Sequence, residues 1–393
     1  MSDFVPTNHH LERFSVEFEY PVAFVRGALD PAERTLAWAI ARREPERRHP
    51  VFFVLDGGLA FARAELYDEV TRYCAAHRAT LELRGEPFVM PGGEQAKNDP
   101  TLVTDLHAEL ARARLDRHAA VVIIGGGAVL DAAGYAAATA HRGLRTVRLP
   151  STVLAQCDGG VGVKNGINGF NAKNFVGTFA PPFAVIDDFD LLATLPLRDA
   201  RAGMAEAVKV ALIRDPALFA WLEENAAGLS EADPEPLASL VRRCAGLHLA
   251  HIAGGGDPFE AGSARPLDYG HWAAHKLELM TRHELRHGEA VAIGMLLDAR
   301  YAEQQGIFPS AELERLENLL GALGLPLYHP ALREQQGEKL AVLAGLEDFR
   351  EHLGGALSIT LLDGIGRARE VRDIDPRGVE AAIGWLIDRA GEP

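Results

Sequence analysis

The sequence predicts an α/β N-terminal domain followed by a mainly α-helical C-terminal domain. Short apolar runs at residues 51–55, 119–124, 146–149 and 184–187 alternate with helical patterns, as in a buried parallel sheet. After residue 195 the pattern is mainly helical, with one strand-like run at 356–362. We therefore expect domains at 1–195 and 196–393, divided at Thr194-Leu195-Pro196.

Composition narrows the class of partner. The 393 residues are 48% apolar, so the chain can bury a full core and form two domains. A net charge of −15 argues against nucleic acid or anionic membrane as the main partner, and any anionic substrate must be held by a local cluster. Cys74, Cys157 and Cys244 are odd in number and far apart, which supports neither a disulfide framework nor a cysteine zinc site. No export signal or membrane span is found, and we expect a cytoplasmic protein.

The first hundred residues show an alternation of strands and helices. We expect a strand within 14–25, a helix over 30–43, a helix over 63–77 and a strand over 80–83. The buried run 51–55 ends at Asp56, which either accepts a ribose hydroxyl or belongs to a plain turn. Glu94 and Lys97 stand three apart at a predicted helix start.

A glycine run follows the strongest strand signal. Residues 119–124 lead directly into Gly125, Gly126 and Gly127, and a helix carrying Asp131 comes next. Glycines at a helix N-terminus let backbone N–H groups approach a phosphate, while the helix dipole favours its charge. The run matches neither GxGxxG nor the Walker A pattern, and a tight turn is the alternative. We predict a Rossmann-like NAD domain.

Residues 150–174 form a second glycine-rich stretch, predicted as a polar loop between buried segments. Such loops often carry chemistry. Lys164, Lys173 and Asn174 can supply the anion cluster that the acidic composition requires, although solvated surface lysines are the alternative.

Two histidine segments indicate a metal site. His271 and His275 are four apart, on one face of a predicted helix, and Gly288 leaves room beside His287. Glu206 and Lys209 lie in an otherwise apolar helix, so Glu206 is the natural carboxylate ligand beside the imidazoles. Core histidines and a surface Glu206–Lys209 ion pair are the alternatives.

Together these motifs resemble the dehydroquinate synthase superfamily, the sugar phosphate cyclases. The resemblance rests on Gly125-Gly126-Gly127 with Asp131, on Gly93-Glu94-Gln95-Ala96-Lys97, on the segment Pro150 to Asp158, and on the histidine segments. It implies NAD, a divalent zinc or cobalt ion, and a homodimer. It also implies a redox-neutral reaction in which NAD oxidises a secondary alcohol, phosphate is eliminated, the ketone is reduced again and an aldol step closes the ring.

The resemblance also implies roles for particular residues. The metal ligands are Glu206, His271 and His287. The expected NAD-binding residues are Asp56, Glu94, Lys97, Gly125, Gly126, Gly127, Asp131, Ser151, Thr152, Asp158, Lys164, Lys173, Thr194 and Leu195. The expected catalytic and substrate-binding residues are Asp158, Lys164, Asn174, Lys209, Asp268, His275 and Arg350.

Departures from the dehydroquinate synthase pattern bear on the substrate. In those enzymes a Lys before the Asp-Glu-x-Glu-x-Gly segment and an Arg after it hold the substrate carboxylate. Here the segment is 257–262, and the two positions correspond to Ala250 and Ala264. Asp268 replaces the usual Asn. This variant looks more like the 2-epi-5-epi-valiolone synthases and the cyclase of the bacterial ebo gene cluster.

We therefore expect a seven-carbon ketose phosphate without a carboxylate, similar to sedoheptulose 7-phosphate, as the substrate. Arg265 could take over the lost anchor, which keeps 3-dehydroquinate synthase as the runner-up. Metal-dependent polyol or glycerol dehydrogenases share the architecture and are a further alternative. Glu206 and the cluster around Lys164 argue against them, because a simple alcohol needs no phosphate clamp.

Overall fold

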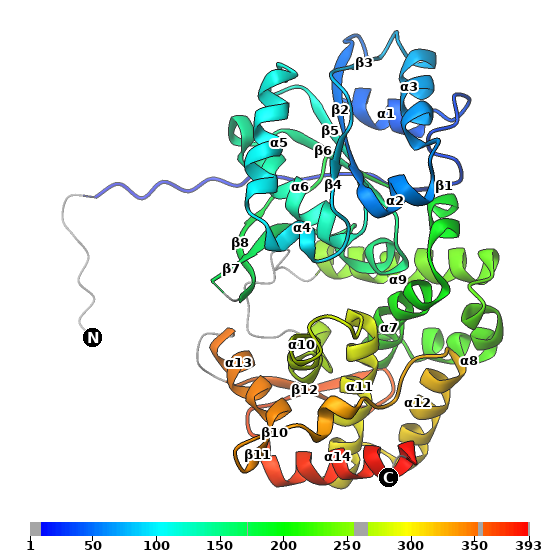
Figure 1. Cartoon of the computed structure of the whole chain (residues 1–393), viewed down its shortest axis with the longest axis vertical. Helices are drawn as coiled ribbons and strands as arrows, with labels where there is room; N and C mark the ends of the chain where they lie inside the picture. The colour runs from blue at the N-terminus through cyan, green and yellow to red at the C-terminus, as the bar shows by residue number, and fades with distance from the viewer. Residues whose placement is uncertain (1–8, 171, 255–265, 353–356, 392–393) are drawn as a thin grey trace.

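The computed structural model describes residues 9–170, 172–254, 266–352 and 357–391. It has an α/β part formed by the first half of the chain and a helical part formed by the second half (Figure 1). This confirms the predicted fold class.

A parallel seven-stranded sheet forms the centre of the N-terminal part. Its strand order is β1-β9-β6-β5-β2-β3, with β4 also paired to β2, and every pairing is parallel. The strands are β1 (Val22–Val25), β2 (His49–Asp56), β3 (Leu81–Leu83), β4 (Phe88–Met90), β5 (Ala120–Gly125), β6 (Arg145–Pro150) and β9 (Ala184–Asp188).

Helices cover both faces of this sheet, as its apolar runs predict. Val51, Phe53 and Leu55 of β2 enter one hydrophobic cluster, whereas Phe52 and Val54 enter the other. This is the period of two that a strand imposes on its side chains. The helices of this part are α1 (Thr35–Ala41), α2 (Gly57–Ala62), α3 (Leu66–Ala76), α4 (Gln95–Asn98), α5 (Thr101–Arg112) and α6 (Gly127–Thr139), with short turns η1 (Ala140–Arg142) and η3 (Phe189–Thr194).

Two expected N-terminal elements are shorter than predicted. The strand of 14–25 is confined to β1, because the residues before it pair with no strand of the described chain. Helix α1 begins at Thr35 rather than near residue 30. Asp30 and Glu33 accept hydrogen bonds from the backbone N–H groups of Ala32 and Thr35, and these local turns compete with the helix.

The predicted loop of 150–174 is largely structured. It contains the π-helical turn η2 (Ala155–Gly159) and an antiparallel hairpin of β7 (Lys164–Gly169) and β8 (Ala172–Phe179). Gly166 lies opposite Gly177 in the hairpin, so the two strands approach closely there. The prediction of a loop was wrong because strands rich in Gly and Asn lack the apolar alternation on which strand prediction depends.

The C-terminal part is built around one large hydrophobic cluster. Its helices are α7 (Leu197–Arg214), α8 (Pro216–Ser230), α9 (Pro234–Gly254), α10 (His271–Met280), α11 (His287–Gln304), α12 (Ser310–Ala322), α13 (Ala344–His352) and α14 (Pro376–Ala390). Shorter elements are η4 (Pro266–Asp268), η5 (Pro330–Arg333), η6 (Ala341–Leu343), β10 (Gln335–Gln336), β11 (Lys339–Leu340), β12 (Ile359–Gly364) and β13 (Arg367–Val371). Among the described helices, none has the length and apolar character needed to cross a membrane.

Candidate active site

Three helices bring one carboxylate and two imidazoles together. Oε1 of Glu206, on α7, lies 3.8 Å from Nε2 of His271 on α10 and 3.8 Å from Nε2 of His287 on α11. These distances are too long for hydrogen bonds. Ligand atoms that each lie about 2.0–2.2 Å from one zinc ion are, however, roughly 3–4 Å from one another. The three ligand atoms converge on a point that a divalent ion can occupy.

The far side of each imidazole is already in use. Nδ1 of His271 lies 3.0 Å from the carbonyl oxygen of Tyr269, and Nδ1 of His287 lies 3.0 Å from Oε2 of Glu278. An acceptor at Nδ1 places the proton there and leaves the Nε2 lone pair for a metal. Oε1 of Glu206 is buried and has no hydrogen-bond partner in the described structure, which a bound cation would correct. The residues therefore fit a metal.

The electrostatics of the two imidazoles differ. Burial, together with the charge of Lys209, lowers the pKa of His271 well below its usual value, so this ring is neutral and ready to bind a cation. Burial also disfavours the charged form of His287, but the carboxylates of Glu278 and Glu206 outweigh burial and raise its pKa. Metal binding at His287 would displace that proton.

Lys209 is buried beside the same carboxylate. Its Nζ lies 2.5 Å from Oε2 of Glu206, and both side chains are buried, so the expected ion pair exists but not on the surface. Burial opposes the charge of Lys209, yet Glu206, Asp158 and Asp268 outweigh it and raise the pKa of the amine. The Glu206 carboxylate thus pairs with the Lys209 ammonium through Oε2 and faces the two imidazoles with Oε1.

Glycines allow the three helices to approach so closely. A Cβ at Gly288, on α11, would overlap the carbonyl oxygen of Ala202 on α7, and one at Gly294 would overlap the carbonyl oxygen of Gly270. Gly270 has a φ of 77° at the start of α10, a left-handed conformation that glycine adopts at low cost. These contacts place His271 and His287 next to Glu206.

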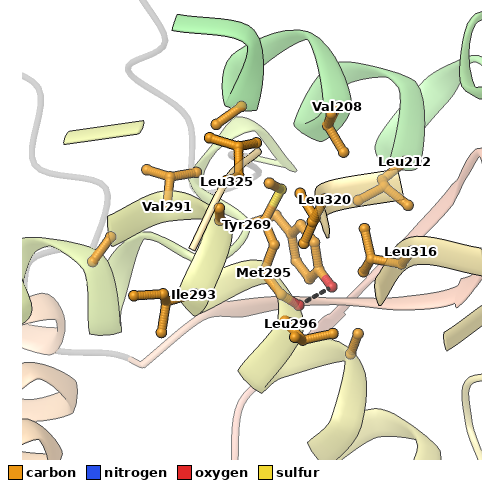
Figure 2. Packing of buried hydrophobic residues seen from close by; sticks show 14 of the residues in the cluster. Val208, Leu212, Tyr269, Val291, Ile293, Met295, Leu296, Leu316, Leu320 and Leu325 are labelled. Atoms are coloured by element: carbon orange, nitrogen blue, oxygen red, sulfur yellow. Dashed lines mark hydrogen bonds between the residues drawn. The ribbon is translucent and has the colours of Figure 1, made fainter. Parts of the chain in front are cut away.

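Packing against the C-terminal core fixes the positions of the residues next to His271. Tyr269 is fully buried among residues such as Leu316 and Leu320, and its hydroxyl donates a hydrogen bond to the carbonyl oxygen of Met295 at 2.8 Å (Figure 2). The buried Asp298 accepts bonds from the N–H of Gly270 and the indole N–H of Trp272. The backbone before and after His271 is therefore held on both sides.

Glu278 joins this helical part to the hairpin of the N-terminal part. Nζ of Lys173, on β8, donates a hydrogen bond to Oε1 of Glu278 at 2.8 Å and forms an ion pair with it, while Oε2 faces Nδ1 of His287. Burial would raise the pKa of Glu278, but His287 and Lys173 outweigh burial and lower it well below its usual range. Lys173 thus contacts the residue that orients a metal ligand.

The glycine run forms the start of α6. The N–H of Gly126 donates to Oδ2 of Asp56, and a Cβ at Gly127 would meet no atom within 4 Å, so the space before the helix N-terminus is open. Thr152 lies against Gly126, and the N–H of Ser151 bonds to the carbonyl oxygen of Gly125. This open N-terminus fits a dinucleotide phosphate. Oδ1 of Asp56 caps α2, so Asp56 takes part in the turn that the alternative interpretation described.

A second set of contacts connects α4, α6 and the hairpin. Nζ of Lys97 lies 2.7 Å from Oδ2 of Asp131 and also bonds to Oδ1 of Asn174. Asn168 of β7 donates to Oε1 of Glu94 at 2.6 Å and accepts from the N–H of Asn174. The hairpin is thereby tied to the helix that follows the glycine run.

A single cavity of about 470 Å³ runs from Asp131 to His271. The hairpin supplies one wall, with Lys164 and Asn174 among its residues, and Lys209 and Asp268 line the side near the metal ligands. Burial would raise the pKa of Asp158, another lining residue, but His248, Lys209 and Lys164 hold it below its usual value. The cavity therefore extends from α6, the helix that begins at the glycine run, to His271 of the ligand set.

Arg148 of β6 supports the strand and turn that carry Asp158 and Lys164. This fully buried guanidinium donates to the carbonyl oxygens of Gly159, Gly160, Gly162 and Lys164 and to Oδ1 of Asn165, at 2.7–3.4 Å. Five N–H donors in a planar fork suit this task.

Several predicted residues lie apart from the cavity lining. Arg350, on α13, is half exposed and pairs with Glu347, and the Thr194 hydroxyl donates to the carbonyl oxygen of Leu191. Leu195 packs against the C-terminal core. The ring of His275 lies 5.4 Å from that of His271, between centroids. The segment 257–262, Ala264 and Arg265 fall outside the described residues, whereas Ala250 lies on α9.

Comparison with known proteins matches this architecture. The family 3-dehydroquinate synthase N-terminal matches residues 87–202, and 3-dehydroquinate synthase C-terminal matches residues 203–344. A 3-dehydroquinate synthase from Xylella fastidiosa is 38% identical over 328 residues, covering 80% of this chain and 85% of that protein. The chain belongs to the 3-dehydroquinate synthase family. The resemblance noted in the sequence is confirmed, and the chain is a sugar phosphate cyclase of this family, a carbon–oxygen lyase.

Two further relatives show how far the likeness extends. The 3-dehydroquinate synthase of Halorhodospira halophila is 36% identical over 356 residues, which cover 87% of this chain and 97% of that protein. The 2-epi-5-epi-valiolone synthase ValA of Streptomyces hygroscopicus, solved with NAD+ and Zn2+ bound, is 31% identical with a TM-score of 0.85, covering 97% of this chain and 100% of that one. The family likeness thus extends over nearly the whole chain.

Four residues of this family member's site were missed by sequence analysis: Glu278, Asn168, His248 and Arg148. Glu278 had a detectable signal, because positions 271, 275 and 278 share one helix face. The other three residues contact partners that are distant in sequence. His248 contacts Asp158, 90 positions away, and Asn168 contacts Glu94, 74 positions away. Arg148 contacts Asn165, which is 17 positions away on another strand. No local pattern indicates such contacts.

Proposed function

We propose that this sugar phosphate cyclase converts a seven-carbon ketose phosphate that lacks a carboxylate, similar to sedoheptulose 7-phosphate, into a cyclitol. NAD would lie along the glycine run with Asp56, Lys97 and Asp131 nearby, and Glu206, His271 and His287 would hold zinc or cobalt. Bound there, the dinucleotide supplies hydride chemistry and the cation polarises substrate oxygens. The two cofactors found in the ValA structure support this assignment.

The charge of the cavity carries the substrate proposal. Its described lining contains the acids Asp131, Asp158 and Asp268 but only two lysines, Lys164 and Lys209. Lys209 is already paired with Glu206. A phosphate can be held by Lys164 and Asn174 of this lining, with His275 nearby beside His271, but a substrate carboxylate would add a further negative charge. A carboxylate that is buried without a charged partner costs several kcal/mol.

The α9 wall favours the same choice. Ala250 stands where dehydroquinate synthases carry a lysine, and α9 contributes His248 and Ile252 to the described cavity lining. His248 is itself paired with Asp158 at 3.2 Å. The helix therefore offers an occupied imidazole and an apolar side chain where an anion would need a cation.

The residues of this chain have distinct tasks in the proposed reaction. Lys164 and Asn174 orient the phosphate from the hairpin, and the phosphate of the substrate can itself act as the base that removes the proton. Lys209, held charged beside Glu206, can donate a hydrogen bond to a substrate oxygen. The hairpin and α9 line the cavity, and a bound substrate between them would shield the reactive intermediates from water.

The 3-dehydroquinate synthase reaction is the second candidate. The relatives in Xylella fastidiosa and Halorhodospira halophila carry that name at 38% and 36% identity. In this reading Arg265 would anchor the carboxylate of a heptulosonate phosphate.

Steady-state kinetics with both substrates decide between the two candidates. We expect phosphate release from sedoheptulose 7-phosphate, with a kcat/KM at least 100-fold above that for the heptulosonate phosphate and no build-up of NADH. A higher kcat/KM for the heptulosonate phosphate, with dehydroquinate as product, would refute the proposal. Stoichiometric NADH would indicate a dehydrogenase instead. As a control, Arg265→Ala should leave the preferred reaction unchanged if Arg265 is not the anchor.

A further inference from the structure

A second group of metal-ligating side chains lies beside the three proposed metal ligands. His275, Glu278 and His287 each offer one ligand atom, and these three atoms lie within 4.8 Å of one another. His287 belongs to both groups. The group of Glu206, His271 and His287 is here called the inner site, and the group of His275, Glu278 and His287 is called the outer site.

His287 can serve both sites because its two ring nitrogens face different carboxylates. Nε2 lies 3.8 Å from Oε1 of Glu206, whereas Nδ1 lies 3.0 Å from Oε2 of Glu278. His275 and Glu278 stand three apart on α10 and so share one face of that helix. The rings of His275 and His287 are stacked, with their centroids 6.0 Å apart. The outer ligand atoms therefore gather on the Nδ1 side of His287, away from Glu206.

The carboxylate of the outer site already attracts cationic groups. Nζ of Lys173 lies 2.8 Å from Oε1 of Glu278, and Nδ1 of His283 lies 4.0 Å from the same oxygen. Burial would raise the pKa of Glu278, but His287 and Lys173 outweigh burial and keep it ionised. An ionised carboxylate next to two imidazoles is a typical set of ligands for a transition metal.

The outer site is open to solvent, unlike the inner one. The side chains of Glu206 and His271 are only 2% and 9% exposed, whereas those of Lys173, His283 and His287 are 25%, 35% and 28% exposed. An ion from solvent can therefore reach the outer site without separation of α10 from α11.

We propose that the outer site binds a second divalent transition-metal ion, such as Zn2+, through His275, Glu278 and Nδ1 of His287. The ion takes the place of the proton on Nδ1 and of the ammonium of Lys173. Two imidazoles favour zinc or copper over Mg2+ and Ca2+, which prefer oxygen ligands. The second ion binds roughly 100-fold or more weakly than the first, because two divalent charges on one imidazole repel each other.

Occupation of the outer site changes the hairpin wall of the cavity. Lys173 loses its partner on α10, and the hairpin that it anchors also carries Lys164 and Asn174 of the cavity lining. The ion also withdraws His275 from the substrate. Excess metal should therefore inhibit the enzyme. This inhibition rests on the proposed function, whereas the binding of the second ion does not.

Calorimetric titration with Zn2+, without substrate, tests the site. The native chain should bind two equivalents, one tight and one weak, and Mg2+ should give no second equivalent. His275→Ala should bind only the first, and retention of that equivalent shows that the variant is folded. His283→Ala is the matched control and should still bind two, because His283 is near Glu278 but outside the outer site. One equivalent in the native chain, or two in His275→Ala, would overturn the proposal.

Amide hydrogen exchange tests the displacement of Lys173. The amides of residues 172–179 should exchange several-fold faster when the second equivalent is bound, because the hairpin has lost its ion pair. Unchanged exchange would show that Lys173 stays on Glu278 and would refute the assigned ligands. Phosphate release should fall over the same range of Zn2+ concentration. Faster exchange with full phosphate release would support the outer site and contradict the phosphate-binding role proposed for His275.

Discussion

Lys173 and Glu278 form an ion pair that joins the two halves of the molecule. Nζ of Lys173, on the hairpin strand β8, lies 2.8 Å from Oε1 of Glu278 on α10, and the other oxygen of Glu278 faces Nδ1 of His287. A single buried carboxylate therefore links the hairpin wall of the cavity to a proposed metal ligand.

Replacement of Lys173 by Met should weaken metal binding by about tenfold, because partners of the ligands typically change metal affinity by 10–100-fold. Competition with a chromophoric chelator for Co2+ measures this affinity without reference to activity. Lys276→Met is the matched control, since Lys276 lies on α10, the helix that carries Glu278, but pairs with the exposed Asp348. Equal effects of the two substitutions would mean that Lys173 acts only through general charge.

His287→Ala should abolish stoichiometric metal binding, because it removes one of three ligand atoms around the orphaned oxygen of Glu206. Metal content after dialysis, measured by mass spectrometry, checks this prediction. His283→Ala serves as the control, as His283 lies 4.0 Å from Glu278 but is absent from the ligand set. Full metal content together with full activity in His287→Ala would rule out the site.

Gly288→Ala should separate α11 from α7, since its Cβ would overlap the carbonyl oxygen of Ala202. We expect a loss of about 2 kcal/mol or more in the free energy of unfolding, together with weaker metal binding. Gly384→Ala, in the interior of α14, meets no atom within 4 Å and should stabilise by about 0.5–1 kcal/mol. Urea denaturation of both variants checks the opposite signs.

Arg148→Met should lower the free energy of unfolding by about 3 kcal/mol, because several buried carbonyl oxygens lose their donor at once. KM for the substrate should rise as well, since the supported turn carries Asp158 and Lys164. By comparison, Arg315→Met removes an exposed pair with Glu223 and should cost less than about 1 kcal/mol. Comparable losses in both variants would contradict the supporting role of Arg148.

The native cysteines should resist thiol reagents. Burial raises the pKa of Cys74 to about 12, so roughly one molecule in 10⁴ carries the thiolate at pH 8. A raised pKa keeps the thiol protonated until the pH approaches that value, so reactivity should stay low throughout the pH range 7–9. The time course of labelling by Ellman's reagent, with and without guanidinium, measures this. Rapid labelling of the folded chain would show that a cysteine is accessible.

The order of elements and many site candidates could be predicted from the sequence because their signals are local. The apolar runs of β2, β5, β6 and β9 determine a sheet buried on both faces, and the glycine run after β5 is read from adjacent residues. The spacing of His271 and His275 indicates a shared helix face. Such patterns depend only on the period of the chain.

Tertiary structure decided which side chains meet. Glu206 and His287 are 81 positions apart, and their 3.8 Å separation depends on the close approach of α7 and α11 at Gly288. The hairpin at 164–179 lacks the apolar alternation that indicates a strand. The Lys173–Glu278 pair joins residues 105 positions apart, so no local pattern indicates it. The tasks of Arg148 and His248 depend on carbonyl oxygens and a carboxylate that other elements deliver. A local period determines which face a residue occupies, whereas helix packing across the whole fold determines what that face contacts.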